Sequence, residues 1–151
     1  IVIGKNARKV WRYYSVDYVA GYCCFLFGSV RDWQRHTVLF TAGKNFDRSG
    51  EIGPMVPAAD VPDPTTLELT TRVNREVMQR GSVAALVFDI PRLIDYCSTF
   101  TELRPGDIIA TGTPGGVGAA RTPPVWLKDG DVVEVDISGI GVLRNPIQDE
   151  S

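Results

Sequence analysis

Two short segments in the first third of the chain carry side chains that can bind a carboxylate or stabilise an enolate. Arg31 and Gln34 lie in the first segment and Lys44 lies in the second. An arginine holds a carboxylate through two parallel hydrogen bonds, a glutamine amide can donate to a keto oxygen, and a lysine ammonium can neutralise an enolate. The same residue types are common in solvated loops, so the residues alone leave both interpretations open.

A glycine-rich stretch, TGTPGGVG at 111–118, is the other candidate for chemistry. It has neither of the glycine orders that bind nucleotide phosphates, and no helix is predicted after it. The hydroxyl group of Thr113 and the backbone N–H groups around Gly112 are suited to cradling a carboxylate or an oxyanion. A turn that needs glycine for its dihedral angles is the alternative. His36 is the only histidine, and because the chain has no G-x-S-x-G motif, we expect it on the surface.

The hydrophobic pattern predicts the elements that position these residues. Apolar residues recur at helical spacing over 91–101, with Asp89 before them and Pro91 in the first turn, so a helix is expected there. A short helix over 15–20 is also expected, capped by Ser15. Strands are predicted where apolar and polar residues alternate or where an apolar run is short, at 21–27, 67–73, 76–79, 108–111, 132–137 and shortly after 139–141. This order favours a β-rich α+β fold with a rolled or sandwiched sheet over repeated βαβ units.

Composition narrows the class of protein. The chain has 151 residues with a hydrophobic content of 44%, which is enough for one globular domain over 1–151. A formal net charge of −2 argues against a nucleic-acid partner. No apolar run approaches the roughly 20 residues that span a bilayer, so no membrane segment is predicted. Three cysteines without a zinc or disulfide spacing indicate reduced thiols, and with no leader visible we expect a cytoplasmic protein, or a mitochondrial matrix protein in a eukaryote.

Taken together, the motifs resemble those of the fumarylacetoacetate hydrolase family, from Ile1 to about Pro146. The most specific are the Arg-Asp-x-Gln block at 31–34 and the Thr-Gly-Thr-Pro block at 111–114. Other matching segments are VIGK at 2–5, YVAGY at 18–22, GKNFD at 43–47, Gly53-Pro54, Val73-Asn74, Pro123-Pro124 and Gly130-Asp131. The resemblance implies the family's mixed β-sandwich roll, of the C-terminal catalytic domain type, and a homodimer.

The resemblance also implies an activity. Its small members include acylpyruvate hydrolases, oxaloacetate decarboxylases and dienedioate isomerases, in which Mg²⁺, Mn²⁺ or Ca²⁺ chelates a keto acid and stabilises the enolate formed when a C–C bond breaks. On these motifs Lys44 would face the enolate and Thr113 and Gly112 would bind the substrate carboxylate or ketone. Arg31 and Gln34 would orient the distal end of a small keto acid or dicarboxylate.

The chain departs from the family at the metal ligands. Two of them are glutamates in a Glu-x-Glu segment that, with the lid, precedes the strand containing Ile1. The third is an aspartate whose position falls on Phe27, with Leu26 where asparagine is usual. We therefore expect no metal ligand in this chain. Two hypotheses follow: a hydrolase or decarboxylase of keto acids whose activity is impaired, or a non-catalytic pseudoenzyme that serves as a binding or scaffolding partner.

Overall fold

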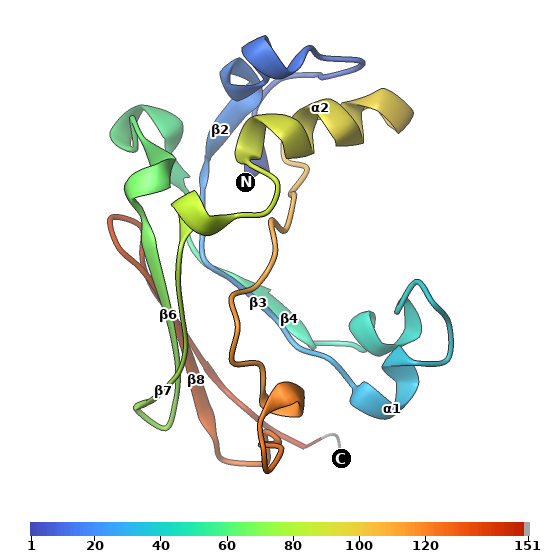
Figure 1. The fold of residues 1–151 in the computed structure, drawn as a ribbon, viewed down its shortest axis with the longest axis vertical. Helices are drawn as coiled ribbons and strands as arrows, with labels where there is room; N and C mark the ends of the chain where they lie inside the picture. The colour runs from blue at the N-terminus through green and yellow to red at the C-terminus, as the bar shows by residue number, and fades with distance from the viewer. Residues whose placement is uncertain (150–151) are drawn as a thin grey trace.

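The strands of residues 1–149, which a computed structural model describes, form three antiparallel sheets (Figure 1). The largest has the strand order β7-β6-β8-β9, the second has the order β1-β2-β5, and the third pairs β3 with β4. In Figure 1, α1 and α2 lie far apart, and β3 and β4 run between them. The strands are β1 Val2–Ile3, β2 Val19–Tyr22, β3 Phe25–Phe27, β4 Gly50–Ile52, β5 Val56–Pro57, β6 Glu68–Val73, β7 Glu76–Ser82, β8 Val132–Ile137 and β9 Gly141–Pro146.

Helices are short apart from α2. The α-helices are α1 Arg31–Gln34 and α2 Ile90–Phe100. The 3-10 helices are η1 Arg12–Tyr18, η2 Ala42–Lys44, η3 Ala58–Asp60, η4 Pro64–Thr66, η5 Val83–Ala85 and η6 Gly118–Ala120. No helix within residues 1–149 combines the length and the apolar character needed to cross a membrane.

The helix predicted over 91–101 is confirmed as α2. The side chain of Asp89 caps it by accepting a hydrogen bond from the backbone N–H of Arg92 at 2.9 Å, and Pro91 lies in the first turn, where its missing N–H costs nothing. Ile94 and Ser98 on its inner face are completely buried. The Ser98 hydroxyl accepts a hydrogen bond from the backbone N–H of Val10 at 3.0 Å, so α2 is also held to the N-terminal segment by a polar contact.

Two clusters of apolar side chains form the core. The first joins the N-terminal segment, α2 and the chain near Leu103. The second lies between β3 and the largest sheet, and its buried members are Cys24, Val135 and Leu143. Burying a side chain of this size contributes about 1.5 to 3 kcal/mol. The buried members of the first cluster are Ile1, Ile3, Ala7, Val10, Ile90, Ile94 and Leu103.

The predicted hairpin forms as β6 and β7, and the predicted strand at 132–137 forms as β8. Asn74 and Arg75 occupy the turn with φ of +50° and +74°, the two positive values that a type I′ hairpin turn requires. The last short strand that was predicted after 139–141 forms as β9, beginning at Gly141.

Three of the predicted elements differ in the structure. The run 21–27 is not one strand, because β2 ends at Tyr22 and β3 begins at Phe25 in a different sheet. The helix expected over 15–20 is instead a 3-10 helix that ends at Tyr18, since the chain enters β2 at Val19. The strand expected over 108–111 is also wrong: this segment pairs with Val2 only through an isolated bridge at Ile108.

Candidate functional site

Close backbone packing brings the Arg31 and Lys44 segments together. The backbone N–H of Val30 donates to the carbonyl of Gly43 at 2.9 Å. A Cβ atom on Gly43 would lie 2.4 Å from Cα and 2.5 Å from the backbone nitrogen of Gln34, so only glycine allows this approach. The packing sets α1, which carries Arg31 and Gln34, against η2, which carries Lys44.

The Lys44 ammonium is held by the end of β3. Its Nζ donates to the carbonyl oxygen of Phe27 at 3.1 Å and to that of Gly28 at 3.4 Å. It also lies over the Phe27 ring, 4.3 Å from the centroid. Partial burial lowers the pKa of Lys44 below its ordinary value, and the nearby Arg31 guanidinium lowers it further. Arg31 and Lys44 are therefore neighbouring cations.

Polar atoms of α1 are left without partners in the interior. The Nε of Arg31 and the Oε1 of Gln34 are both buried, and neither makes a hydrogen bond within residues 1–149. Across those residues neither Arg31 nor Lys44 takes part in an ion pair. A buried donor without a partner is a costly arrangement, and two neighbouring cations repel each other; a bound anion would relieve both.

A cavity of about 540 Å³ lies beside α1. Trp126 contributes an aromatic side chain to it, and Ala119, the residue that follows the glycine-rich segment, lies on its wall. Arg31 is thus the predicted site residue that lines this cavity. The cavity is lined by Arg31, Asp32, Arg35, Ala119 and Trp126.

Thr113 is positioned by the hairpin. The Nε2 of Gln79 on β7 donates to Thr113 Oγ1 at 2.8 Å and to the carbonyl oxygen of Pro114 at 2.8 Å. Gly112 has a φ of +129°, which glycine adopts readily and other residues rarely adopt, and both Gly112 and Thr113 are exposed. Within the described part of the chain, no hydrogen bond joins Gly112 or Thr113 to Lys44. The structure therefore groups Arg31, Gln34 and Lys44 by packing α1 on η2, and it fixes Thr113 through Gln79 of the hairpin.

Sequence reasoning missed three residues that shape this region. Gln79 fixes the glycine-rich segment, Arg121 donates from Nε to the carbonyl oxygen of Gly116 at 3.1 Å, and Trp126 lines the cavity. None of them lies in a recognisable motif, and Gln79 acts on a segment that begins more than 30 residues further along the chain. The one sequence feature that could have pointed to Gln79 is that it is a long polar side chain on a predicted strand, and this feature does not indicate which segment it contacts.

The side chains that residues 1–149 place around Lys44 do not form a donor set that fits a divalent cation. Mg²⁺ and Ca²⁺ require several oxygen ligands, and the Phe27 ring supplies none. Among residues 1–149, no three His, Cys, Asp or Glu side chains gather closely enough to hold a metal ion. His36 is exposed, as predicted, with its ring 4.8 Å from the ring of Trp33.

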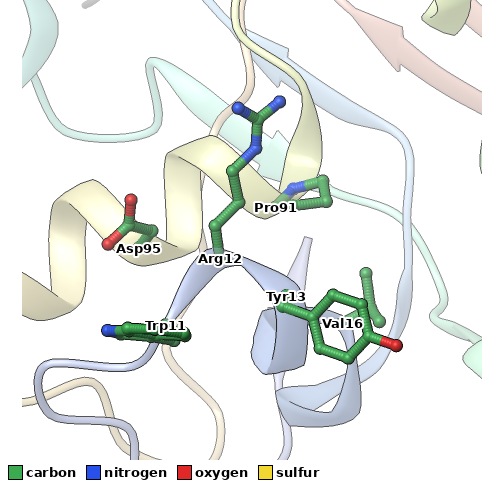
Figure 2. Close-up of a pocket in the computed structure, with 6 residues that line it drawn as sticks. All are labelled: Trp11, Arg12, Tyr13, Val16, Pro91 and Asp95. Carbon is green, nitrogen blue, oxygen red and sulfur yellow. The ribbon is translucent and has the colours of Figure 1, made fainter.

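A larger cavity, of about 680 Å³, lies elsewhere, between η1 and α2. Figure 2 shows Arg12 extending from η1 across α2, with Asp95 on one side and Pro91 on the other. Trp11 and Tyr13 line this cavity with largely exposed rings, and none of the predicted site residues reaches it. We therefore place the candidate site at α1 and η2.

Comparison with known proteins places this geometry in a family. The sequence is 40% identical over 148 residues to oxaloacetate tautomerase YisK of Bacillus subtilis, a match that covers 97% of this chain and 49% of that protein. The fold matches the fumarylacetoacetate hydrolase of psychrophilic Exiguobacterium antarcticum with a TM-score of 0.95 and 38% identity, over 99% of this chain and 54% of that one.

A third relative is a fumarylpyruvate hydrolase from Pseudomonas aeruginosa, whose structure contains Mn²⁺ and pyruvate. It matches with a TM-score of 0.88 and 33% identity, over 99% of this chain and 63% of that one. The chain spans about half the length of the curated relatives it matches. The predicted β-rich roll is confirmed by the structural matches. A family model described as fumarylacetoacetate (FAA) hydrolase C-terminal matches residues 1–148, and the chain belongs to this family.

Proposed function

We propose that this chain binds a small keto acid or dicarboxylate at Arg31 and Lys44, within a family scaffold for enolate chemistry. The observation that carries the proposal is the packing of α1 on η2, which places Arg31 and Lys44 together as two cations that take part in no ion pair within residues 1–149. Arg31 also lines a cavity of about 540 Å³. Asp32 also lines that cavity, but within the described residues it lies in no ion pair with Arg31 or Arg35. A carboxylate ligand therefore supplies the missing negative charge.

Each basic side chain takes a different part in the proposed site. The guanidinium of Arg31, whose Nε makes no hydrogen bond within residues 1–149, donates to the ligand carboxylate. The Lys44 ammonium donates toward the oxygen of a keto group or enolate and stabilises its negative charge. Hydrolytic C–C cleavage of an acylpyruvate, decarboxylation and keto–enol tautomerisation all pass through an enolate, and the named relatives support this class of reaction.

A second candidate function is binding without turnover. It is favoured by Phe27, which fills a metal-ligand position of the family with a ring that has no oxygen. In that case the chain retains the anion site and acts as a binding or scaffolding partner. Both candidates require ligand binding at Arg31 and Lys44, and they differ in whether product forms.

The proposal is tested by the melting temperature in the presence of oxalate or pyruvate. A ligand at 100 times its Kd stabilises the folded state by about 2.7 kcal/mol, which raises the melting temperature of a chain of this size by roughly 5 to 10 °C. We expect the rise in the wild type and its loss in Lys44→Ala and Arg31→Ala. Lys128→Ala, which removes an exposed lysine outside the cavity wall, is the control and retains it.

Turnover separates the two candidates. Loss of acylpyruvate or oxaloacetate absorbance with wild-type protein, and not with Lys44→Ala, supports the enzyme. Ligand-dependent stabilisation without turnover supports the binding partner. A melting temperature that rises equally in the wild type and in Lys44→Ala contradicts the site assignment.

A further inference from the structure

In this fold the ammonium of Lys44 packs on the face of the Phe27 ring. Phe27 is the last residue of β3 and pairs with Gly50 of β4. Its ring stacks on that of Phe25, with centroids 5.2 Å apart and planes 18° from parallel. The Lys44 Nζ lies 4.3 Å from the Phe27 centroid. The negative face of an aromatic ring attracts a cation, so the strand presents a surface that holds an ammonium.

Two backbone carbonyls also contact the ammonium. We call the Phe27 ring and these two carbonyls the seat of Lys44. Lys44 donates to the carbonyl oxygens of Phe27 and Gly28, and the backbone N–H of Gly28 is itself tied to the carbonyl of Ser49 at 2.8 Å. An ammonium has three N–H donors, so one remains for a ligand. The seat fixes a positive charge at the end of β3, beside Arg31.

The resemblance to the family places a metal-binding aspartate at the position of Phe27. A phenyl ring and two carbonyls suit an ammonium and do not suit a small dication that needs several charged oxygens. We propose that the Lys44 ammonium, seated on the Phe27 ring, is the cation of this site, so that the chain binds a carboxylate without a divalent metal. The proposal rests on the carboxylate-binding function argued above.

Phe27 is then a positioning residue that acts through Lys44. Removing the ring face leaves the ammonium with its two carbonyl contacts alone. An exposed cation–π contact supports about a two- to fivefold change in affinity. Phe27→Leu should therefore weaken oxalate binding by about two- to fivefold, whereas Phe27→Tyr retains the ring and should retain the affinity.

The experiment measures the binding of oxalate, and separately of pyruvate, by calorimetry with and without metal. Metal is removed on a chelating resin, because the carboxylates of soluble EDTA would compete for the same site. Mn²⁺ is then added back in a parallel series, in which the free oxalate concentration is corrected for the oxalate that Mn²⁺ binds in solution. We expect the wild-type affinity to be the same in both series, and Phe27→Leu to be weaker in both. Phe25→Leu is the matched control, since it removes the neighbouring ring of the same strand and leaves the ring under Lys44.

The outcomes separate this inference from the function on which it rests. Binding that appears only with Mn²⁺ overturns the inference and leaves the proposed function standing. Metal-independent binding that is unchanged in Phe27→Leu overturns the role of the ring. An absence of oxalate and pyruvate binding in both series overturns the inference and the proposed function together. A methylene proton signal of Lys44 that is shifted upfield by the ring in the wild type and Phe27→Tyr, and not in Phe27→Leu, supports the seat directly.

Discussion

Gly43 determines how closely α1 and η2 approach, and with it the separation of Arg31 and Lys44. An added Cβ would lie 2.4 Å from Gln34 Cα, which is backbone and cannot rotate away. Gly43→Ala should destabilise the fold by about 1 to 3 kcal/mol, the usual cost of forcing extra volume into a packed contact. It should also reduce the oxalate-dependent rise in melting temperature. Urea unfolding and the melting assay measure the two effects.

Gly53→Ala is the control for this prediction. The nearest atom to a Cβ at Gly53 is 3.6 Å away, an ordinary contact, so stability should change little. Equal losses in the two variants would contradict the packing argument, because both remove glycine's backbone freedom and only Gly43→Ala adds a close contact.

For single residues, the sequence predicts that Arg31, Gln34 and Lys44 come together. It does not predict which other side chains contact the site. Their motif spacing indicated one carboxylate-binding region, and the structure packs α1 on η2. The contact between Gln79 and Thr113 links residues 34 positions apart, so no local pattern signals it. From the sequence, Phe27 indicated only that a metal-ligating oxygen is missing at that position. That its ring would lie under Lys44 depends on where η2 returns against β3, which the sequence does not encode locally.

Among the elements, the β6–β7 hairpin contains a conformational cost at its turn. Arg75 adopts a φ of +74°, where an L side chain is strained and glycine is not. Arg75 is exposed, and within the described residues it is in no ion pair. Arg75→Gly should therefore stabilise the protein by about 1 kcal/mol, as measured by urea unfolding. Arg75→Ala removes the same side chain without relieving the backbone, so a gain of equal size there would contradict this explanation.

The elements predicted correctly are those specified by their own residues. β8 alternates between apolar and polar residues from Val133 to Ile137, α2 has its cap and its apolar spacing, and the hairpin has its turn. The strand predictions that were wrong depended on which other strand each segment pairs with. The 108–111 segment has strand-forming residues, yet it meets the N-terminal segment through a single bridge. The apolar run 21–27 divides because β2 pairs with β5 and β3 pairs with β4.

For the whole molecule, many large apolar side chains remain exposed. Tyr13 is 82% exposed and Leu39 is 80% exposed, and they lie on η1 and on the loop between α1 and η2. Surface of this kind is common at interfaces between chains. The homodimer expected from the family resemblance stays a prediction, which sedimentation velocity can check.

Three aspartates couple the stability of the whole molecule to pH. Hydrogen bonds lower the pKa of each carboxyl below its ordinary value. The first donor in each case is Thr65 for Asp63, the Arg92 backbone N–H for Asp89, and Asn74 for Asp131. These bonds fix η4, the start of α2, and the turn before β8, so they lie in separate parts of the fold.

Because the folded-state pKa of each aspartate is lowered, its contribution to stability is present above the unfolded-state pKa and is lost as pH falls through the folded-state pKa. The urea midpoint should therefore fall between about pH 5 and pH 2. Replacing Asp63, Asp89 and Asp131 together by asparagine keeps hydrogen-bond acceptors but removes the charge. This variant should be less stable than the wild type at pH 7, and the difference should narrow in acid. A difference between the two proteins that stays constant from pH 7 to pH 3 would show that these carboxylates do not carry the acid sensitivity.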